Sequence, residues 1–125
     1  MNIDIVKLNS QGPQLLEEFV KKMGVEGAIL ATSDGLEMAS FFNNSSRDAD
    51  LIAADSASML STITGMLDNT GKGKLKEMII TADNGSIAVK DLGEDIALAV
   101  LAPEGYKMGA LVVSLKVFIK EIQAF

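Results

Sequence analysis

Apolar residues recur at helical spacing in the first well-defined segment of the chain, from about Pro13 to Met23. The apolar positions of this segment are Leu15, Leu16, Phe19 and Met23. Pro13 suits the first turn of a helix, and Gly24 suits the position just past its end. The pattern therefore predicts a helix over residues 13–23 with one apolar face, whereas residues 1–10 are ambiguous.

Residues 26–32 and 36–42 are two strand-like runs, separated by Ser33-Asp34-Gly35. An Asp-Gly pair between such runs is typical of a hairpin turn, because glycine tolerates the positive φ that primed turns require. Alternation along the second run assigns one face to Leu36, Met38, Ser40 and Phe42. Each face of this strand mixes polar and apolar residues, so we expect an edge or interface strand.

The remaining segments complete a single α+β domain over residues 1–125, of which residues 1–12 could be an N-terminal extension. We expect a long helix at about 48–68, strands at 75–82, 86–92 and 96–102, and a last helix at 108–123. The turn at 83–85 and the reversal at 92–95 make the three strands antiparallel. The predicted fold class is a five-stranded antiparallel sheet with helices on both faces, in the order α-β-β-α-β-β-β-α.

The long middle helix has no charged residue between Asp55 and Asp68. A helix that faces solvent normally has a charged side. One stripe can pack on the domain's own sheet, and it consists of Ile52, Ser56, Met59, Ile63 and Met66, with Leu60 and Leu67 beside it. A second stripe has only small side chains, and it consists of Ala54, Ser58, Ser61 and Gly65.

The glycine in this second stripe needs an explanation, because glycine inside a helix costs about 1 kcal/mol relative to alanine. We therefore infer close packing against a second helix, most simply that of an identical subunit, while a neutral solvent-facing surface is the alternative.

Composition excludes most enzyme classes. The chain has 48% hydrophobic and 22% charged residues, a composition typical of globular proteins. It contains neither cysteine nor histidine. Thiolate and imidazole nucleophiles, their metal sites and disulfides are therefore excluded. The net charge of −6 disfavours binding to nucleic acid or anionic membranes. We find no signal peptide and no apolar run long enough to insert in a membrane, so we expect a cytoplasmic protein.

Few residues invite a chemical interpretation. Arg47, the only arginine, could act as an arginine finger, but a solvated loop charge is the simpler interpretation. Residues 71–74, Gly-Lys-Gly-Lys, lack the phosphate-binding loop pattern. The acidic residues near the start of the middle helix, Asp48, Asp50 and Asp55, match no calcium loop and suit the helix dipole. We assign no catalytic residue, metal or cofactor, and we take Glu94 and Asp95 as solvated turn residues.

Residues 25–36 and the small-residue helix resemble the Roadblock, or dynein light chain Roadblock-type, domains, which are related to profilin-like and longin-like folds. Residues 96–102 are similar to the central last strand of this family, and the resemblance covers about residues 15–122. The resemblance implies a homodimer in which the second strands of two subunits pair into a ten-stranded sheet, with the two middle helices side by side. It also implies partners such as Ras-like small GTPases, or a place as adaptor in a larger assembly, without catalytic residues.

We therefore expect a non-enzymatic homodimer that regulates or scaffolds a Ras-like small GTPase. The alternatives are a structural adaptor in a motor or signalling complex without a GTPase, and a small-ligand sensor. The expected dimer interface consists of Leu36, Met38, Ser40, Phe42, Ala54, Ser58, Ser61, Thr62 and Gly65.

Overall fold

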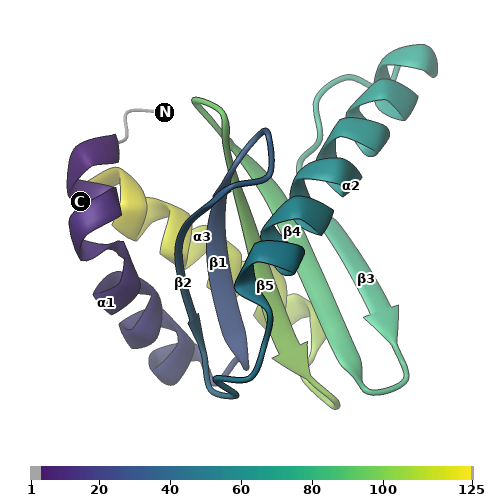
Figure 1. The fold of residues 1–125 in the computed structure, drawn as a ribbon. Helices are drawn as coiled ribbons and strands as arrows, with labels where there is room; N and C mark the ends of the chain where they lie inside the picture. Colours follow the sequence, from purple (N-terminus) through teal and green to yellow (C-terminus); the bar gives the residue numbers. More distant parts are fainter. Residues whose placement is uncertain (1–3, 125) are drawn as a thin grey trace.

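The structure is a computed structural model that describes residues 4–124. Its elements are α1 (Ile5–Met23), β1 (Gly27–Thr32), β2 (Glu37–Phe42), α2 (Ala49–Asn69), β3 (Met78–Ala82), β4 (Gly85–Gly93), β5 (Ile96–Pro103) and α3 (Met108–Ala124). Their order is the predicted one. The strands form one antiparallel sheet in the order β2-β1-β5-β4-β3 (Figure 1).

Strand β5 lies at the centre of this sheet, where it pairs with both β1 and β4. Its residues 96–100 are buried throughout, which confirms the prediction of a strand covered on both faces. The central position follows from an apolar run that no edge strand could expose. The two edges of the sheet are β2 and β3.

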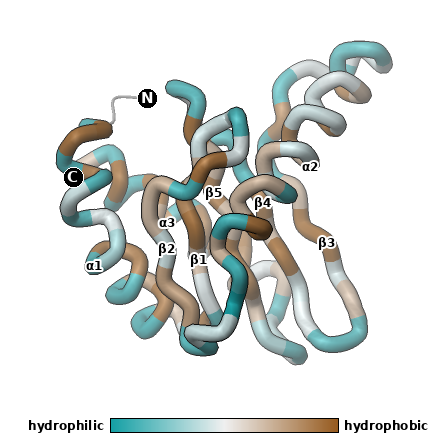
Figure 2. The backbone as a smooth tube through the Cα atoms, in the orientation of Figure 1, coloured by the Kyte–Doolittle hydropathy of each residue, from teal (hydrophilic) through white to brown (hydrophobic). Residues whose placement is uncertain are grey.

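The three helices divide unequally between the two faces. Helices α1 and α3 cover one face, and the larger core lies between them and the sheet, including the rings of Phe19 and Phe118, whose centroids are 4.2 Å apart. Helix α2 lies alone on the other face, above a smaller core around Ile29, Ala53 and Val89. Figure 2 shows α2 mostly in pale, intermediate colours, whereas α1 has distinct hydrophobic and hydrophilic sides. The face under α2 is therefore the less completely covered one.

Helix α1 begins earlier than the sequence pattern predicts. It starts at Ile5, with Asp4 as the N-cap whose carboxylate accepts the Lys7 N–H at 3.0 Å. Pro13 lies inside the helix rather than at its start, and since it is exposed, the carbonyl that its missing N–H would have bonded can reach water. Leu8 is fully buried. Residues 5–12 are thus part of the domain, and residues 1–3 lie outside the described part.

The C-terminal end of α1 is tied to the start of α3. The Tyr106 hydroxyl donates a hydrogen bond to the Met23 carbonyl at 2.7 Å and lies 3.1 Å from the Ser114 hydroxyl. Gly24 follows α1 in the left-handed region, as predicted, and its N–H bonds to the Val20 carbonyl.

Candidate interaction surfaces

The small-residue stripe of α2 is exposed along its whole length. The structure places all five predicted residues of this helix on its accessible surface, namely Ala54, Ser58, Ser61, Thr62 and Gly65. A Cβ atom at Gly65 would meet no atom within 4 Å. Within the described chain, therefore, no contact explains a glycine at this position.

The sheet-facing side of α2 is buried most fully near the start of the helix. Ala53 and Ser56 are buried there, and the Ser56 hydroxyl donates to the Ile52 carbonyl at 2.7 Å. The last turns of α2 project beyond the sheet in Figure 1. Met66, which the pattern assigned to the sheet-facing stripe, is 56% exposed for this reason. Helix α2 is therefore longer than the sheet surface that could bury its apolar side.

An apolar groove of about 370 Å³ follows the β3 side of α2. Its lining residues are Ile52, Asp55, Ser56, Ser58, Met59, Ile87 and Leu101. Ile87 pairs across the sheet with Ile80 of β3, so the two side chains share a face. Ile80 is 39% exposed. An apolar strip therefore runs from α2 to the β3 edge.

The other edge strand, β2, does not have the regular faces that the sequence predicts. Its register with β1 shifts at Leu30/Ala31, where Ala39 pairs with Leu30 and Glu37 with Ala31, leaving Met38 as the extra residue of a β-bulge. Met38 consequently packs on the α1/α3 side of the sheet, whereas Phe42 packs on the α2 side. The prediction that Leu36, Met38, Ser40 and Phe42 share one face is therefore wrong, because Met38 and Phe42 pack on opposite faces of the sheet.

The two predicted parts of the interface meet at one end only. A Cβ at Gly35, in the turn before β2, would lie 3.2 Å from the Cα of Ala54, at the start of the small-residue stripe. Leu36 is 64% exposed beside this turn. The turn has three residues, 33–35, because the Thr32 N–H bonds to the Leu36 carbonyl and only Gly35 has a positive φ. It is therefore a hairpin, as predicted, although without a primed two-residue turn.

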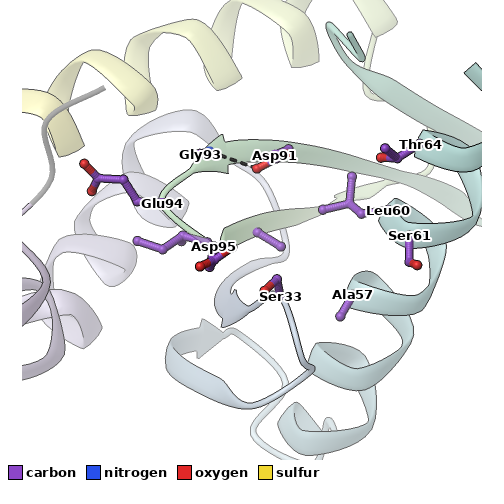
Figure 3. Close-up of a pocket in the computed structure, with 11 residues that line it drawn as sticks. Ser33, Ala57, Leu60, Ser61, Thr64, Asp91, Gly93, Glu94 and Asp95 are labelled. Atoms are coloured by element: carbon purple, nitrogen blue, oxygen red, sulfur yellow. Dashed lines mark hydrogen bonds between the residues drawn. The ribbon is translucent and has the colours of Figure 1, made fainter. Parts of the chain in front are cut away.

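A second hollow, of about 320 Å³, lies on the opposite flank of α2, between this helix and the β4–β5 hairpin (Figure 3). We call it the hairpin hollow. Its lining residues are Ser33, Ala57, Leu60, Ser61, Thr64, Asp91, Gly93, Glu94, Asp95, Ile96 and Ala97. In Figure 3, Glu94 points away from α2 at the tip of the hairpin. Sequence reasoning missed this hollow because its walls come from separate segments of the chain.

The polar residues considered earlier have local structural contacts or lie exposed in a loop. Arg47 is exposed and pairs with Glu26 at 3.2 Å. Asp48 is the N-cap of α2, where its carboxylate accepts the Leu51 N–H at 3.1 Å. Residues 71–74 are exposed and lead toward a strand. Among residues 4–124 there is no group of three or more acidic side chains placed to hold a metal ion, and no helix in this part is long and apolar enough to cross a membrane.

The described part of the chain thus combines a five-stranded sheet of this order with one helix, α2, whose outer face no other element covers. The sequence model of the Roadblock/LC7 domain matches residues 13–102, so the chain belongs to the Roadblock/LC7 family. This result confirms the resemblance and the fold class read from the sequence.

Solved structures show the same fold at low sequence identity. Myxococcus xanthus MglB superposes with a TM-score of 0.83 at 14% identity, covering 99% of this chain and 90% of that one. A Roadblock/LC7 domain from Streptomyces avermitilis gives 0.77 at 22% identity, covering 90% and 94%. The gliding protein MglB from Thermus thermophilus gives 0.79 at 17% identity, covering 93% and 88%. A search of curated proteins found no match.

Proposed function

We propose that this protein is a non-enzymatic, cytoplasmic homodimer that binds a Ras-like small GTPase and regulates or recruits it. The observation that carries the proposal is the exposed, uncharged face of α2, with a glycine that touches nothing in the single chain. Membership of the Roadblock/LC7 family supports the choice of partner, because the resemblance to this family implies Ras-like small GTPases as partners. Binding by shape and surface agrees with the lack of histidine and cysteine.

The structure favours β3 over β2 as the strand edge that joins the two subunits. Charged residues and bulges are the usual devices that protect an edge strand from pairing. Strand β2 has both, in Glu37 and in the bulge at Met38. Strand β3 has no charged residue and a regular register with β4, and the apolar groove of α2 is lined by Ile87 of that neighbouring strand β4. We propose that β3 pairs with its symmetry mate beneath two adjacent α2 helices; pairing through β2 stays the prediction from the family resemblance.

A pair of matched substitutions tests this assignment. Ile80→Lys places a charge in the middle of the β3 edge, and Leu36→Lys places the same charge beside β2, at a more exposed residue. We expect light scattering after size exclusion to find monomers for Ile80→Lys and dimers for Leu36→Lys, because an unpaired charge in an interface costs several kcal/mol. The reverse result would support pairing through β2.

Partner binding is tested with the purified protein and Ras-like small GTPases, each loaded with GDP or with a non-hydrolysable GTP analogue. A regulator should bind one nucleotide state at least about tenfold more tightly, because a ligand shifts a two-state protein only by its differential affinity. Binding independent of nucleotide, or none, would instead support the structural adaptor. Added homodimer should also change the rate of GTP hydrolysis or nucleotide exchange if it regulates rather than recruits.

A further inference from the structure

The hairpin hollow combines three kinds of surface that a long cationic side chain can use together. Leu60, Ile96 and Ala97 provide apolar contact, Ser61 and Thr64 provide hydroxyl groups from α2, and Asp91 and Asp95 provide carboxylates from the hairpin. Arginine and lysine have an apolar stem that packs on hydrophobic surface and a charged head that pairs with carboxylates. A neutral or acidic side chain would gain no electrostatic attraction from these carboxylates, which are exposed to solvent.

The acidic residues at this end of the sheet take no part in an ion pair within the described part of the chain. The ion pairs among residues 4–124 are Lys21–Glu17, Lys22–Glu121 and Arg47–Glu26. Asp91 accepts only the Gly93 N–H, at 2.8 Å, and the Asp95 carboxylate has no partner in this part of the chain. Asp34 and Glu37 add negative charge in and beside the neighbouring turn and are likewise without an ion pair.

The turn of the β4–β5 hairpin contains acidic residues where turn preferences favour asparagine and glycine. Glu94 and Asp95 have φ values of 54° and 62°, and two consecutive residues with positive φ define a turn that favours Asn-Gly. The Asp95 carbonyl accepts the Ser33 N–H at 2.9 Å, which fixes this turn against the β1–β2 turn. The Asp95 carboxylate is therefore held beside α2 by a turn that is hydrogen-bonded to the β1–β2 turn.

We propose that the hairpin hollow receives an arginine or lysine side chain from the protein partner. The identity of that partner as a small GTPase rests on the proposed function, whereas the chemistry of the hollow does not. Ala57 and Ser61 face the hollow, while Ile52 and Met59 face the groove on the other flank of α2. Ser61 lies at the border between the hollow and the small-residue stripe, so a dimer joined through β3 leaves the hairpin side of the hollow, with Asp91 and Asp95, open on each subunit.

The first test uses N-acetyl-arginine amide as the probe and N-acetyl-citrulline amide as its neutral isostere. In titrations of the ¹⁵N-labelled protein, we expect the arginine probe to shift the amide signals of residues 60–64 and 91–97. The citrulline probe should leave those signals in place, and added salt should weaken the arginine effect. Equal shifts with both probes, or shifts spread over every acidic surface, would overturn the proposal.

Matched charge removals make the test specific. Asp95→Asn suits the left-handed backbone, and Asp83→Asn removes the same charge from the β3–β4 turn at the other end of the sheet. Asp95→Asn should raise the dissociation constant of the arginine probe about two- to fivefold, as expected for one exposed ion pair, and Asp83→Asn should not change it. Equal effects of the two variants would contradict the proposal.

The same variants separate this proposal from the proposed function. If a GTPase binds the parent protein, Asp95→Asn should weaken that binding and Asp83→Asn should not. Unchanged GTPase binding by Asp95→Asn would refute the role of the hollow and leave the GTPase proposal intact. Binding of the arginine probe without any GTPase partner would support the hollow and count against the GTPase.

Discussion

Replacement of Gly65 by leucine should have opposite effects on a lone chain and on a dimer. In the lone chain Gly65 is exposed, and an added side chain would meet no atom within 4 Å. Leucine is favoured over glycine in a helix interior by roughly 0.6–1 kcal/mol. If α2 faces only solvent, Gly65→Leu should therefore raise the midpoint of thermal unfolding by about 3–6 °C for a domain of this size.

A dimer that packs two α2 helices closely reverses the sign. The leucine side chain would fill the space that lets the two backbones approach, and overpacking of a well-fitted contact costs typically about 1–3 kcal/mol. We expect Gly65→Leu to elute as a monomer in size exclusion with light scattering. Its melting temperature should also lose the dependence on protein concentration that a dimer shows.

Gly109→Leu is the matched control, because Gly109 is also a helical glycine in open space, near the start of α3. This variant should keep the oligomeric state of the parent. A Gly65→Leu protein that stays dimeric and melts at a higher temperature would refute the assignment of this α2 face to the interface.

Two further substitutions test how the helices are fixed to the sheet. A Cβ at Gly12 would lie 2.8 Å from the Cβ of Ala39, so Gly12→Ala should destabilise the domain by about 1–3 kcal/mol in denaturant unfolding, with partial rescue by Ala39→Gly. Tyr106→Phe removes the hydrogen bond to the Met23 carbonyl and the contact with Ser114, and should cost about 1 kcal/mol by the same measurement; an unchanged midpoint would mean that water replaces the hydroxyl.

The order of elements could be predicted from sequence because each helix and strand has its own local signal. Residues 96–100 are continuously apolar and lie at the sheet centre, and Gly24 and Gly35 mark real chain reversals. The start of α1 could not be predicted in this way. Residues 9–12, Asn-Ser-Gln-Gly, look like a loop, and Gly12 is required by the close approach of Ala39, a residue of another element.

The candidate surfaces were predictable only in part, for a similar reason. The small-residue face of α2 is a property of one helix, so its periodicity identifies it. The bulge at Met38 depends on how β2 registers with β1, and the hairpin hollow joins Ser33, Ser61 and Asp95 from separate segments. A signal for the hollow was present in Glu94 and Asp95, which occupy turn positions where asparagine and glycine are preferred.

The central position of β5 has a consequence for how the chain folds. The β1–β2 and β3–β4 hairpins can each form from local contacts, but they join one sheet only when residues 96–103 insert between them. Closure of the sheet therefore depends on pairing between segments about seventy residues apart, which slows folding. During synthesis, the edges of β1 and β4 that face β5 stay unpaired until β5 leaves the ribosome. We therefore expect the nascent chain to be most prone to aggregation in this interval.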